Sequence, residues 1–271
     1  MNGRIKLIIS IIATITIILI ISLAGILMDE DVLKADFKIK NIEPCLEYPF
    51  GTDWMGRDML ARTVKGLSIS IVIGLVASLV SAVMAVIIGT LAGTMPKWVD
   101  SILGWLIDLV MGIPHLVLLI LISFAVGRGI KGVMIGIAVT HWTSLARLVR
   151  SEVLQIRNEF YIKLSKKLGK SNIYILKNHI LPHLLPQFII GLVLLFPHAI
   201  LHEAAVTFLG FGLPPEVPAI GIILSESMKY LSAGKWHLAL FPGLSLVAIV
   251  LLFEHIGSNI KKVLDPYNAQ N

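Results

Sequence analysis

Six long apolar runs follow one another along the chain, each close in length to one crossing of a lipid bilayer. A helix of about 20 predominantly apolar residues spans the hydrocarbon core of a membrane, and such runs are longer than most core helices of soluble proteins. We therefore predict an all-α integral membrane protein with six transmembrane helices. The runs cover residues 7–28, 67–93, 102–126, 132–148, 185–209 and 238–260.

The composition supports the same class of protein. Hydrophobic residues make up 56% of the chain and charged residues 15%, and the mean hydropathy is +0.86. So few charged side chains cannot cover the surface of a soluble protein of this length. A net charge of +6 is typical of basic cytoplasmic loops and does not indicate nucleic-acid binding. The single cysteine, Cys45, excludes an intrachain disulfide and a cysteine-based metal site.

Basic residues gather on one side of the predicted membrane. They are frequent between the fourth and fifth runs and at both ends of the chain, whereas acidic neighbours offset the lysines of the first outer loop. Because cytoplasmic segments carry the excess of lysine and arginine, we predict a multi-pass protein of the cytoplasmic membrane with both termini in the cytoplasm. The basic residues on that side are Arg4, Lys6, Arg147, Arg150, Arg157, Lys163, Lys166, Lys167, Lys170, Lys177, Lys261 and Lys262.

The first run has two interpretations, a cleaved signal peptide or an uncleaved anchor. The small residues of "SLAG" offer a cleavage site, but the apolar stretch is longer than the core of an ordinary signal peptide. We therefore expect an anchor. The chain is predicted to consist of an anchor helix with an outer loop (residues 1–65), a transmembrane domain (66–260) and a cytoplasmic tail (261–271).

The cytoplasmic segment between the fourth and fifth runs is too long for a simple connection. Residues 161–168 have a helical pattern with basic residues on one face, and Gly169 breaks it. Residues 170–172 can turn and cap a second short helix over 173–180, which Pro182 is expected to end. Two roles stay open on these residues alone: resting on anionic lipid, or docking to a cytoplasmic partner.

The fifth run carries ionisable residues where a membrane helix rarely has them. His198 and His202 are four residues apart and share one helix face. Counting from Pro186 at about 1.5 Å per residue places His198 roughly 18 Å along the helix, near the middle of the membrane. Ionisable groups at this depth usually face a pathway or the bundle interior. They either form interhelical hydrogen bonds together with Glu203 or pass a transition metal, because imidazole is a good ligand for nickel, zinc and copper.

Three other functions are possible for a membrane protein with these residues: a zinc protease, an ATPase and a passive channel. A zinc protease needs a His-Glu-x-x-His pattern, but after His202-Glu203 no histidine stands at the required place. No Walker A pattern occurs, so the chain is not predicted to be an ATPase, and no catalytic residue is assigned. A passive channel remains an alternative.

The basic cytoplasmic segment resembles the "EAA" loop of importer permeases of the ABC class, which have a glycine and a Leu-Pro pair at fixed distances after the triplet. Lys163 stands where that family has an acidic residue, which puts a salt bridge by that residue in doubt. In the family this loop docks on a separate ATPase. The residues that carry the resemblance, and the implied coupling role, are Lys163, Leu164, Ser165, Gly169, Leu181 and Pro182.

Further motifs extend this resemblance over nearly the whole chain, to the dipeptide, oligopeptide and nickel permeases and to their C-type subunit. A single match of this kind would be weak, but the ordered set with its spacing is specific. The motifs are "YPFGTDWMGRDMLARTVKG" (48–66), "WVDSILGWLIDLVMGIPHL" (98–116), "ARLVRSEVL" (146–154), "FLGFGLPP" (208–215), "FPGL" (241–244) and "LDP" (264–266).

The resemblance implies a type I ABC importer permease fold over the transmembrane domain. It also implies a heterodimer with a second permease, two ATPase subunits that hold ATP and magnesium, and an extracytoplasmic substrate-binding protein. It implies no cofactor on this chain. In the family, the segment corresponding to residues 214–231 forms a lid over the pore mouth.

The resemblance also indicates the cargo. Nickel permeases carry His-x3-His and His-Trp at the places occupied here by His198, His202 and His141-Trp142, so we expect import of nickel, free or chelated, with short peptides as the alternative. His198 and His202 are the candidate metal ligands. The candidate pathway residues are His115, His198, His202 and Glu203.

We predict structural roles for two buried carboxylates and for one segment of the outer loop. Asp108 and Glu203 are expected to be buried structural carboxylates rather than ligands. In the outer loop, Asp53, Arg57 and Asp58 lie in a segment that we expect to form a short interfacial helix. Whether that segment caps itself or meets a partner stays open.

Overall fold

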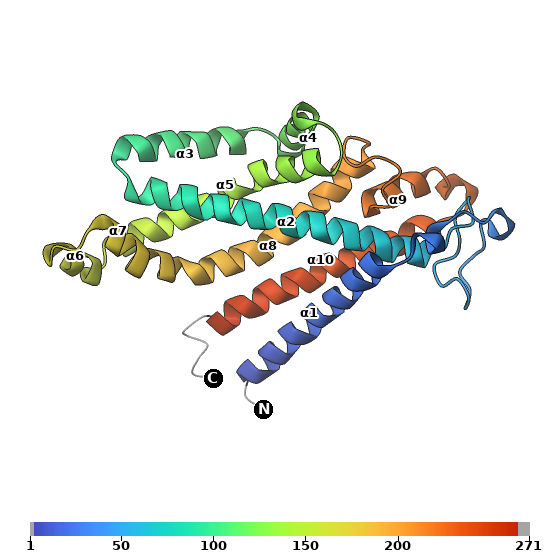
Figure 1. Ribbon diagram of the computed structural model, residues 1–271, viewed down its shortest axis with the longest axis horizontal. Coiled ribbons are helices and arrows are strands. Elements are labelled where there is room, and N and C mark those ends of the chain that lie inside the picture. Colours follow the sequence, from blue (N-terminus) through green and yellow to red (C-terminus); the bar gives the residue numbers. More distant parts are fainter. Residues whose placement is uncertain (1–2, 265–271) are drawn as a thin grey trace.

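Long helices lie side by side in the structure, a computed structural model that describes residues 3–264 (Figure 1). The α-helices are α1 (Gly3–Leu27), α2 (Met59–Thr94), α3 (Lys97–Gly112), α4 (His115–Val126), α5 (Ile130–Ile156), α6 (Phe160–Lys167), α7 (Asn172–Ile175), α8 (Leu181–Phe208), α9 (Ile220–Met228) and α10 (His237–Leu264). The shorter helical turns are η1 (Glu30–Leu33), η2 (Phe37–Ile39), η3 (Leu176–Ile180, a π-helix) and η4 (Leu231–Ala233).

Five of these helices are long and apolar enough to cross a membrane, and α3 with α4 makes a sixth crossing if the pair counts as one broken span. The predicted all-α membrane fold is thereby confirmed. The prediction of one continuous helix over residues 102–126 is wrong, because α3 and α4 meet at 99°. Pro114 lies at the break and Ile113 before it is extended. Proline offers no N–H to the helix and disfavours helical backbone in the residue before it.

The beginning of α1 and the end of α10 lie toward the same end of the molecule as α6 and α7 (Figure 1). This arrangement agrees with an even number of crossings. That this end faces the cytoplasm remains a prediction. The proposed domain boundaries also remain predictions. The boundary at residue 65 falls inside α2, and most of the tail, residues 265–271, lies outside the described residues.

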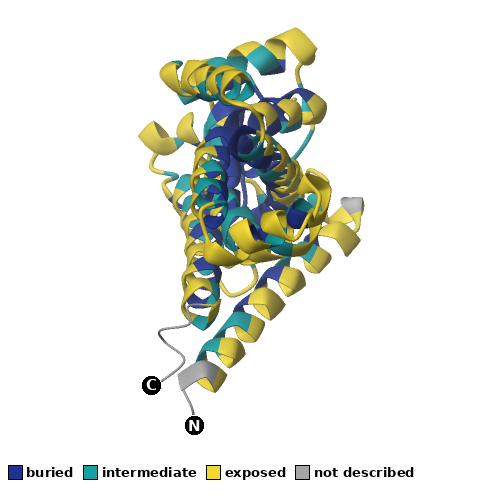
Figure 2. Ribbon diagram, turned by 90° about the vertical axis from the view of Figure 1, so that its left-hand side faces the viewer, coloured by how far each residue is buried: buried dark blue, intermediate teal, exposed yellow. Residues whose placement is uncertain are grey.

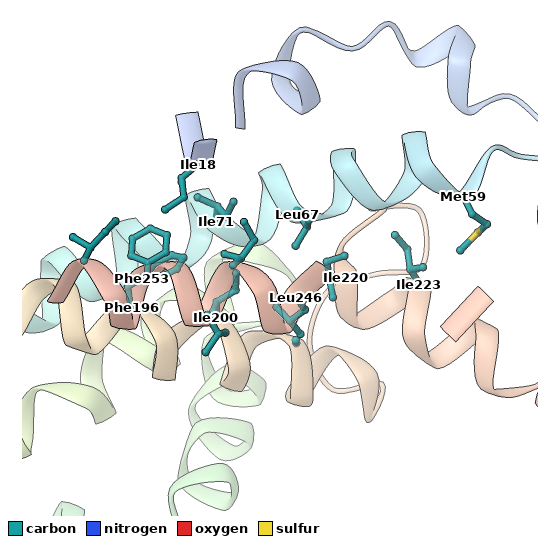
Figure 3. Close-up of a cluster of buried hydrophobic side chains, with 14 of the residues drawn as sticks. Ile18, Met59, Leu67, Ile71, Phe196, Ile200, Ile220, Ile223, Leu246 and Phe253 are labelled. Atoms are coloured by element: carbon teal, nitrogen blue, oxygen red, sulfur yellow. The ribbon is translucent and has the colours of Figure 1, made fainter. Parts of the chain in front are cut away.

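Buried residues gather along the centre of the bundle, whereas exposed residues cover its outward faces (Figure 2). Exposed apolar side chains are frequent along α1, as expected for a helix in contact with lipid or with another subunit. One buried cluster joins α1, α2, α8, α9 and α10 (Figure 3). At its centre the rings of Phe196 and Phe253 are stacked, with their centroids 3.6 Å apart. Two further clusters pack α5 against α2 and α8.

The segment between α5 and α8 forms what we call the basic arm, residues 160–180. As predicted, a first helix, α6, is followed by a turn at Gly169, whose φ of +76° lies in the left-handed region. The hydroxyl of Ser171 then caps α7 by accepting a hydrogen bond from the N–H of Tyr174 at 3.2 Å.

The prediction that Pro182 ends this second helix is wrong. Helical backbone runs without a break from Asn172 to Phe208. The π-helical turn η3 lies immediately before the proline, and the N–H of Leu181 bonds to the carbonyl of Leu176. In a π-turn each hydrogen bond spans one residue more than in an α-helix, so the ordinary helical bonding pattern has already changed before Pro182, which has no N–H to offer.

The expected interfacial helix around Asp53 is also absent among the described residues. The segment is a tight loop, in which a carboxylate oxygen of Asp53 accepts hydrogen bonds from the backbone N–H groups of Met55 and Arg57. Asp58 caps α2 by accepting from the N–H of Leu60 at 2.9 Å. Short acidic side chains that accept from nearby N–H groups favour turns and helix caps over the interior of a helix.

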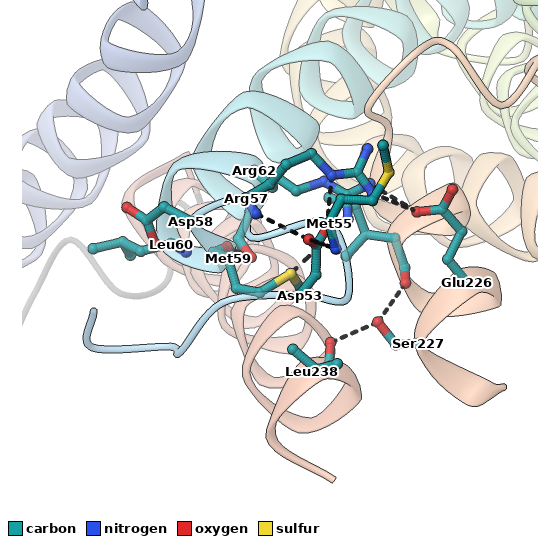
Figure 4. A network of polar contacts seen from close by, with 12 residues as sticks. Asp53, Met55, Arg57, Asp58, Met59, Leu60, Arg62, Glu226, Ser227 and Leu238 are labelled. Atoms are coloured by element: carbon teal, nitrogen blue, oxygen red, sulfur yellow. Dashed lines mark hydrogen bonds and ion pairs between the residues drawn. The ribbon is translucent and has the colours of Figure 1, made fainter. Parts of the chain in front are cut away.

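This loop is tied to two helices by four charged residues, two of them buried and two partly exposed, which we call the outer latch: Asp53 and Arg62, with Arg57 and Glu226 (Figure 4). The guanidinium of Arg62 donates to Asp53 and to Glu226, each at 2.8 Å. Asp53 is fully buried and Arg62 is 2% exposed. The latch therefore connects the outer loop, the beginning of α2 and the helix α9.

Candidate functional site

A cavity of about 720 Å³, which we call the central cavity, lies among the helices α3, α4, α5 and α8. Its wall is mostly apolar but includes four histidines and several hydroxyl groups. A largely apolar cavity with a few converging polar groups is the usual form of a small-molecule site. The lining residues are Val110, Met111, Gly112, Ile113, Pro114, His115, Thr140, His141, Thr143, Ser144, Leu145, Leu148, Gly191, Leu194, Leu195, His198 and His202.

Three of these histidines meet and form what we call the imidazole cluster: His115, His141 and His202. One potential ligand nitrogen from each ring lies within 4.8 Å of the other two. The ring centroids are 4.4 Å apart for His115 and His141, 4.6 Å for His115 and His202, and 5.1 Å for His141 and His202. The rings meet edge to face.

Each ring comes from a different helix, so the tertiary fold creates the cluster. His115 is the first residue of α4, and the bend at Pro114 places it beside α5. His141 lies near the middle of α5. His202 lies on α8, one turn after His198. The broken third crossing is therefore what brings the first imidazole to the other two.

Hydrogen bonds to backbone carbonyls fix the tautomers of two of the rings. Nδ1 of His141 lies 3.0 Å from the carbonyl oxygen of Ile137, and Nδ1 of His202 lies 2.7 Å from that of His198. A carbonyl oxygen only accepts, so in both rings Nδ1 carries the proton. In a neutral imidazole, Nε2 then keeps its lone pair and is free to act as a ligand.

The Nε2 atom of His141 is buried without a partner. His141 is 7% exposed, and its Nε2 makes no hydrogen bond within residues 3–264. Leaving a buried acceptor unpaired costs about 1–3 kcal/mol. A cation or a water molecule held by the cluster would satisfy this atom.

The structure brings together only some of the predicted pathway residues. His115 and His202 join the cluster, whereas the exposed His198 lines the cavity and contributes its backbone carbonyl to the cluster. Glu203 points elsewhere: it is fully buried and accepts a hydrogen bond from Thr207 at 3.0 Å. His141 was missing from the predicted site, although the His141-Trp142 pair was a signal for it.

Asp108 was expected to be a buried structural carboxylate, and this is wrong. Its side chain is 70% exposed and pairs with Arg147 of α5, which is also exposed. The helix α3 packs on the bundle through Ile107, the preceding residue, so Asp108 faces outward. The expectation holds for Glu203, which is buried.

The predicted coupling residues lie on the basic arm and at the start of α8. Leu164 and Leu181 are exposed, and three other apolar side chains of the arm are more exposed still: Phe160 77%, Leu168 70% and Ile173 77%. The arm is anchored by the buried side chains of Ile162 and Ile175. It therefore presents an apolar surface on a well-anchored base, a combination that suits docking on a partner.

The wall of the central cavity depends on a close contact between α5 and α8. A Cβ atom added at Gly191 would lie 2.6 Å from Cδ1 of Leu145. Replacing Gly191 by valine should therefore displace the buried side chain of Leu145 from its packed position and destabilise the protein by about 1–3 kcal/mol. We expect a lower midpoint of heat denaturation for the purified protein. The matched control is Gly104→Val, since an added Cβ there meets nothing within 4 Å. Equal midpoints for the two variants would contradict the contact.

Comparison with protein families gives one match over residues 85–268. The matching family is described as "Binding-protein-dependent transport system inner membrane component". The match includes the whole basic arm and all three histidines of the imidazole cluster.

Named relatives are similar over most of the chain. The dipeptide transport system permease protein DppC of Alkalihalophilus pseudofirmus is 33% identical over 223 residues, covering 82% of this chain and 73% of that protein. DppC of Bacillus subtilis is 29% identical over 240 residues, covering 89% and 75%. The oligopeptide permease OppC of Bacillus subtilis is 29% identical over 223 residues, covering 82% and 73%.

The fold is also similar to a solved structure. The MetNI methionine ABC transporter, in inward-facing conformations, matches with a TM-score of 0.62 at 20% identity. The match covers 76% of this chain and 98% of the other. At this identity the likeness concerns the fold, which is that of a type I ABC importer permease.

Proposed function

Because the chain belongs to the family of binding-protein-dependent transport system inner membrane components, we propose that it is the permease through which an importer carries nickel, free or chelated. Membership makes it a membrane-embedded permease subunit of an ABC importer and not an enzyme. The family works with ATPase and binding-protein partners. The choice of nickel as cargo is the part that we propose.

The imidazole cluster is the observation that supports nickel. Three histidines from three helices converge in a membrane-embedded cavity, with one ligand nitrogen of each within 4.8 Å of the others. Histidine is rare at this depth and usually marks a transport pathway. Imidazole is a suitable ligand for nickel, zinc and copper, and a divalent ion crossing an apolar region needs ligands to replace its water.

Short peptides are the second candidate cargo, because the named relatives are dipeptide and oligopeptide permeases. The comparisons favour peptides over nickel, whereas the cavity favours the metal. A peptide brings a charged ammonium and a charged carboxylate, yet the lining contains no Asp, Glu, Lys or Arg among the described residues. At 33% identity the residues of a pocket can differ while the fold is kept.

The proposed mechanism is alternating access. We propose that two ATPase subunits bind ATP and magnesium, and that their closure moves the basic arm. The arm continues into α8, whose other end carries His202, so a movement at Gly169 is transmitted to the central cavity. A second permease would complete the cavity, and the extracytoplasmic binding protein would deliver cargo near α9. No cofactor is proposed on this chain.

Uptake by cells tests the cargo. We expect radioactive nickel to enter cells with this gene and not cells without it, whereas uptake of a labelled dipeptide should be unchanged. His202→Gln should lower nickel uptake at least ten-fold, since losing even a supporting residue of a metal site costs about 10–100-fold. The matched control is His255→Gln, an exposed histidine of α10 outside the cavity. Loss of dipeptide uptake alone on deleting the gene would favour the peptide permease instead.

A further inference from the structure

We infer that His115, His141 and His202 bind the imported ion directly through three ring nitrogens, so that no chelator supplies all of the donor atoms around it. This inference rests on the proposed import of a transition metal and adds how that metal is held. It replaces the His198 and His202 pair suggested by the sequence with a ligand set drawn from three helices. The only part of His198 that it uses is the backbone carbonyl.

The geometry fits a metal ion with modest movement. Metal–nitrogen bonds to histidine are about 2.0–2.1 Å long, so neighbouring donor atoms in such a site lie roughly 3 Å apart. Here the three candidate nitrogens are within 4.8 Å of one another. Rotation of the side chains closes the difference, because one face of the cluster borders open cavity and not packed core.

The surroundings already hold the rings in the manner of a metal site. Metal-ligating histidines almost always donate their second N–H to a carbonyl or carboxylate, which sets the tautomer and the ring direction. His141 donates from Nδ1 to Ile137, and His202 donates from Nδ1 to His198. The hydroxyl of Thr140 lies 3.3 Å from Nε2 of His115 and 3.1 Å from Nδ1 of His141, which ties these two rings together.

The ligand set indicates which ions are accepted. Uncharged nitrogen donors favour nickel, cobalt, copper and zinc, whereas magnesium and calcium require oxygen donors. No carboxylate is present among the described residues of the lining, so the bound ion keeps its full charge in an apolar surrounding. Binding is then moderate in strength, as transport requires: tight enough to enter the site and weak enough to leave it.

The number of coordination positions around the ion also excludes a cargo whose chelator supplies all six donor atoms. Three imidazoles occupy half of the six positions around an octahedral nickel ion, and water fills the rest. A chelator that supplies six donor atoms leaves no position for histidine. At this point of the pathway the ion is therefore stripped of any such chelator.

Direct binding to the assembled importer tests the inference. The complex is purified through a tag on this chain and placed in lipid nanodiscs, and nickel chloride is the probe. X-ray absorption at the nickel edge should show three imidazole ligands with light-atom donors completing the shell. Nickel–EDTA, in which the chelator supplies all six donors, should not bind, and a large excess of magnesium should not displace nickel.

Single replacements identify the ligands. We expect nickel binding to weaken at least ten-fold in each of three variants, His115→Gln, His141→Gln and His202→Gln. The control is His198→Gln, one helical turn from His202, whose dissociation constant for nickel should stay within about two-fold of the wild-type value. Copurification of the ATPase subunits shows that each variant assembles. The ligand set is wrong if the X-ray absorption spectrum of the wild-type protein shows no imidazole ligands. It is also wrong if His198→Gln weakens nickel binding as much as the other three replacements do, even when cells import nickel. Nickel binding at the cluster in cells that import only peptide supports the site and refutes the proposed cargo.

Discussion

A valine in place of Gly169 is expected to lower ATP-driven uptake roughly 5–30-fold while the protein still reaches the membrane in normal amount. The turn at Gly169 has a φ of +76°, and an added Cβ would meet no atom of the described residues within 4 Å. The penalty therefore comes from the backbone alone, about 1–2 kcal/mol for a residue with a side chain in the left-handed region. A penalty of that size changes the population of the turn by a factor of about 5–30, and α6 loses its direction relative to α7.

The control for this prediction is Gly169→Asn. Asparagine enters the left-handed region more readily than other residues with a side chain, so this variant should keep most of the uptake. Uptake of the transported species by whole cells is the measurement, with membrane content determined by immunoblot. Valine and asparagine variants that transport equally well would show that the shape of this turn does not transmit the ATPase movement.

Features that depend on local pattern could be predicted from the sequence. The apolar runs located the five helices that are long and apolar enough to cross a membrane, because the length of a helix across a bilayer is set by the bilayer itself. The turn at Gly169 and the cap at Ser171 were also predicted correctly, since both arise within a few residues. The family resemblance of the basic arm rested on the same local signals.

Features that depend on packing between helices could not be predicted in this way. Periodicity shows the apolar run around Pro114 but not the direction in which the chain continues after it, and that direction decides where His115 lies. The pair His198 and His202 was chosen because the two share a helix face, yet the partners of His202 come from α4 and α5. The helical backbone through Pro182 depends on the π-turn before it, which has no recognised sequence signal.

The second large effect is expected at the outer latch, where Arg62→Met should destabilise the protein by about 2–4 kcal/mol, because two charge-assisted hydrogen bonds are lost. Removing Arg62 takes away one of the two guanidinium groups that compensate the buried Asp53, and leaves only Arg57, whose Nε donates to Asp53 at 2.7 Å. Asp53 is fully buried, and Arg62 is the only residue that binds both Asp53 and Glu226 at hydrogen-bond distance among residues 3–264. Without it the helix α9, which carries Glu226, loses its main polar tie to the outer loop and α2.

Heat denaturation of the purified importer measures this effect, and the midpoint should fall by on the order of 10 °C, at roughly 2–4 °C per kcal/mol. The matched control is Lys34→Met, which removes a salt bridge to Asp31 in which both side chains are at least 70% exposed. Exposed pairs contribute at most about 1 kcal/mol, so this midpoint should hardly move. Because Arg62 and Glu226 join α2 to α9 at the outer end, a variant with a normal midpoint but leaky uptake would show instead that the latch controls opening rather than stability.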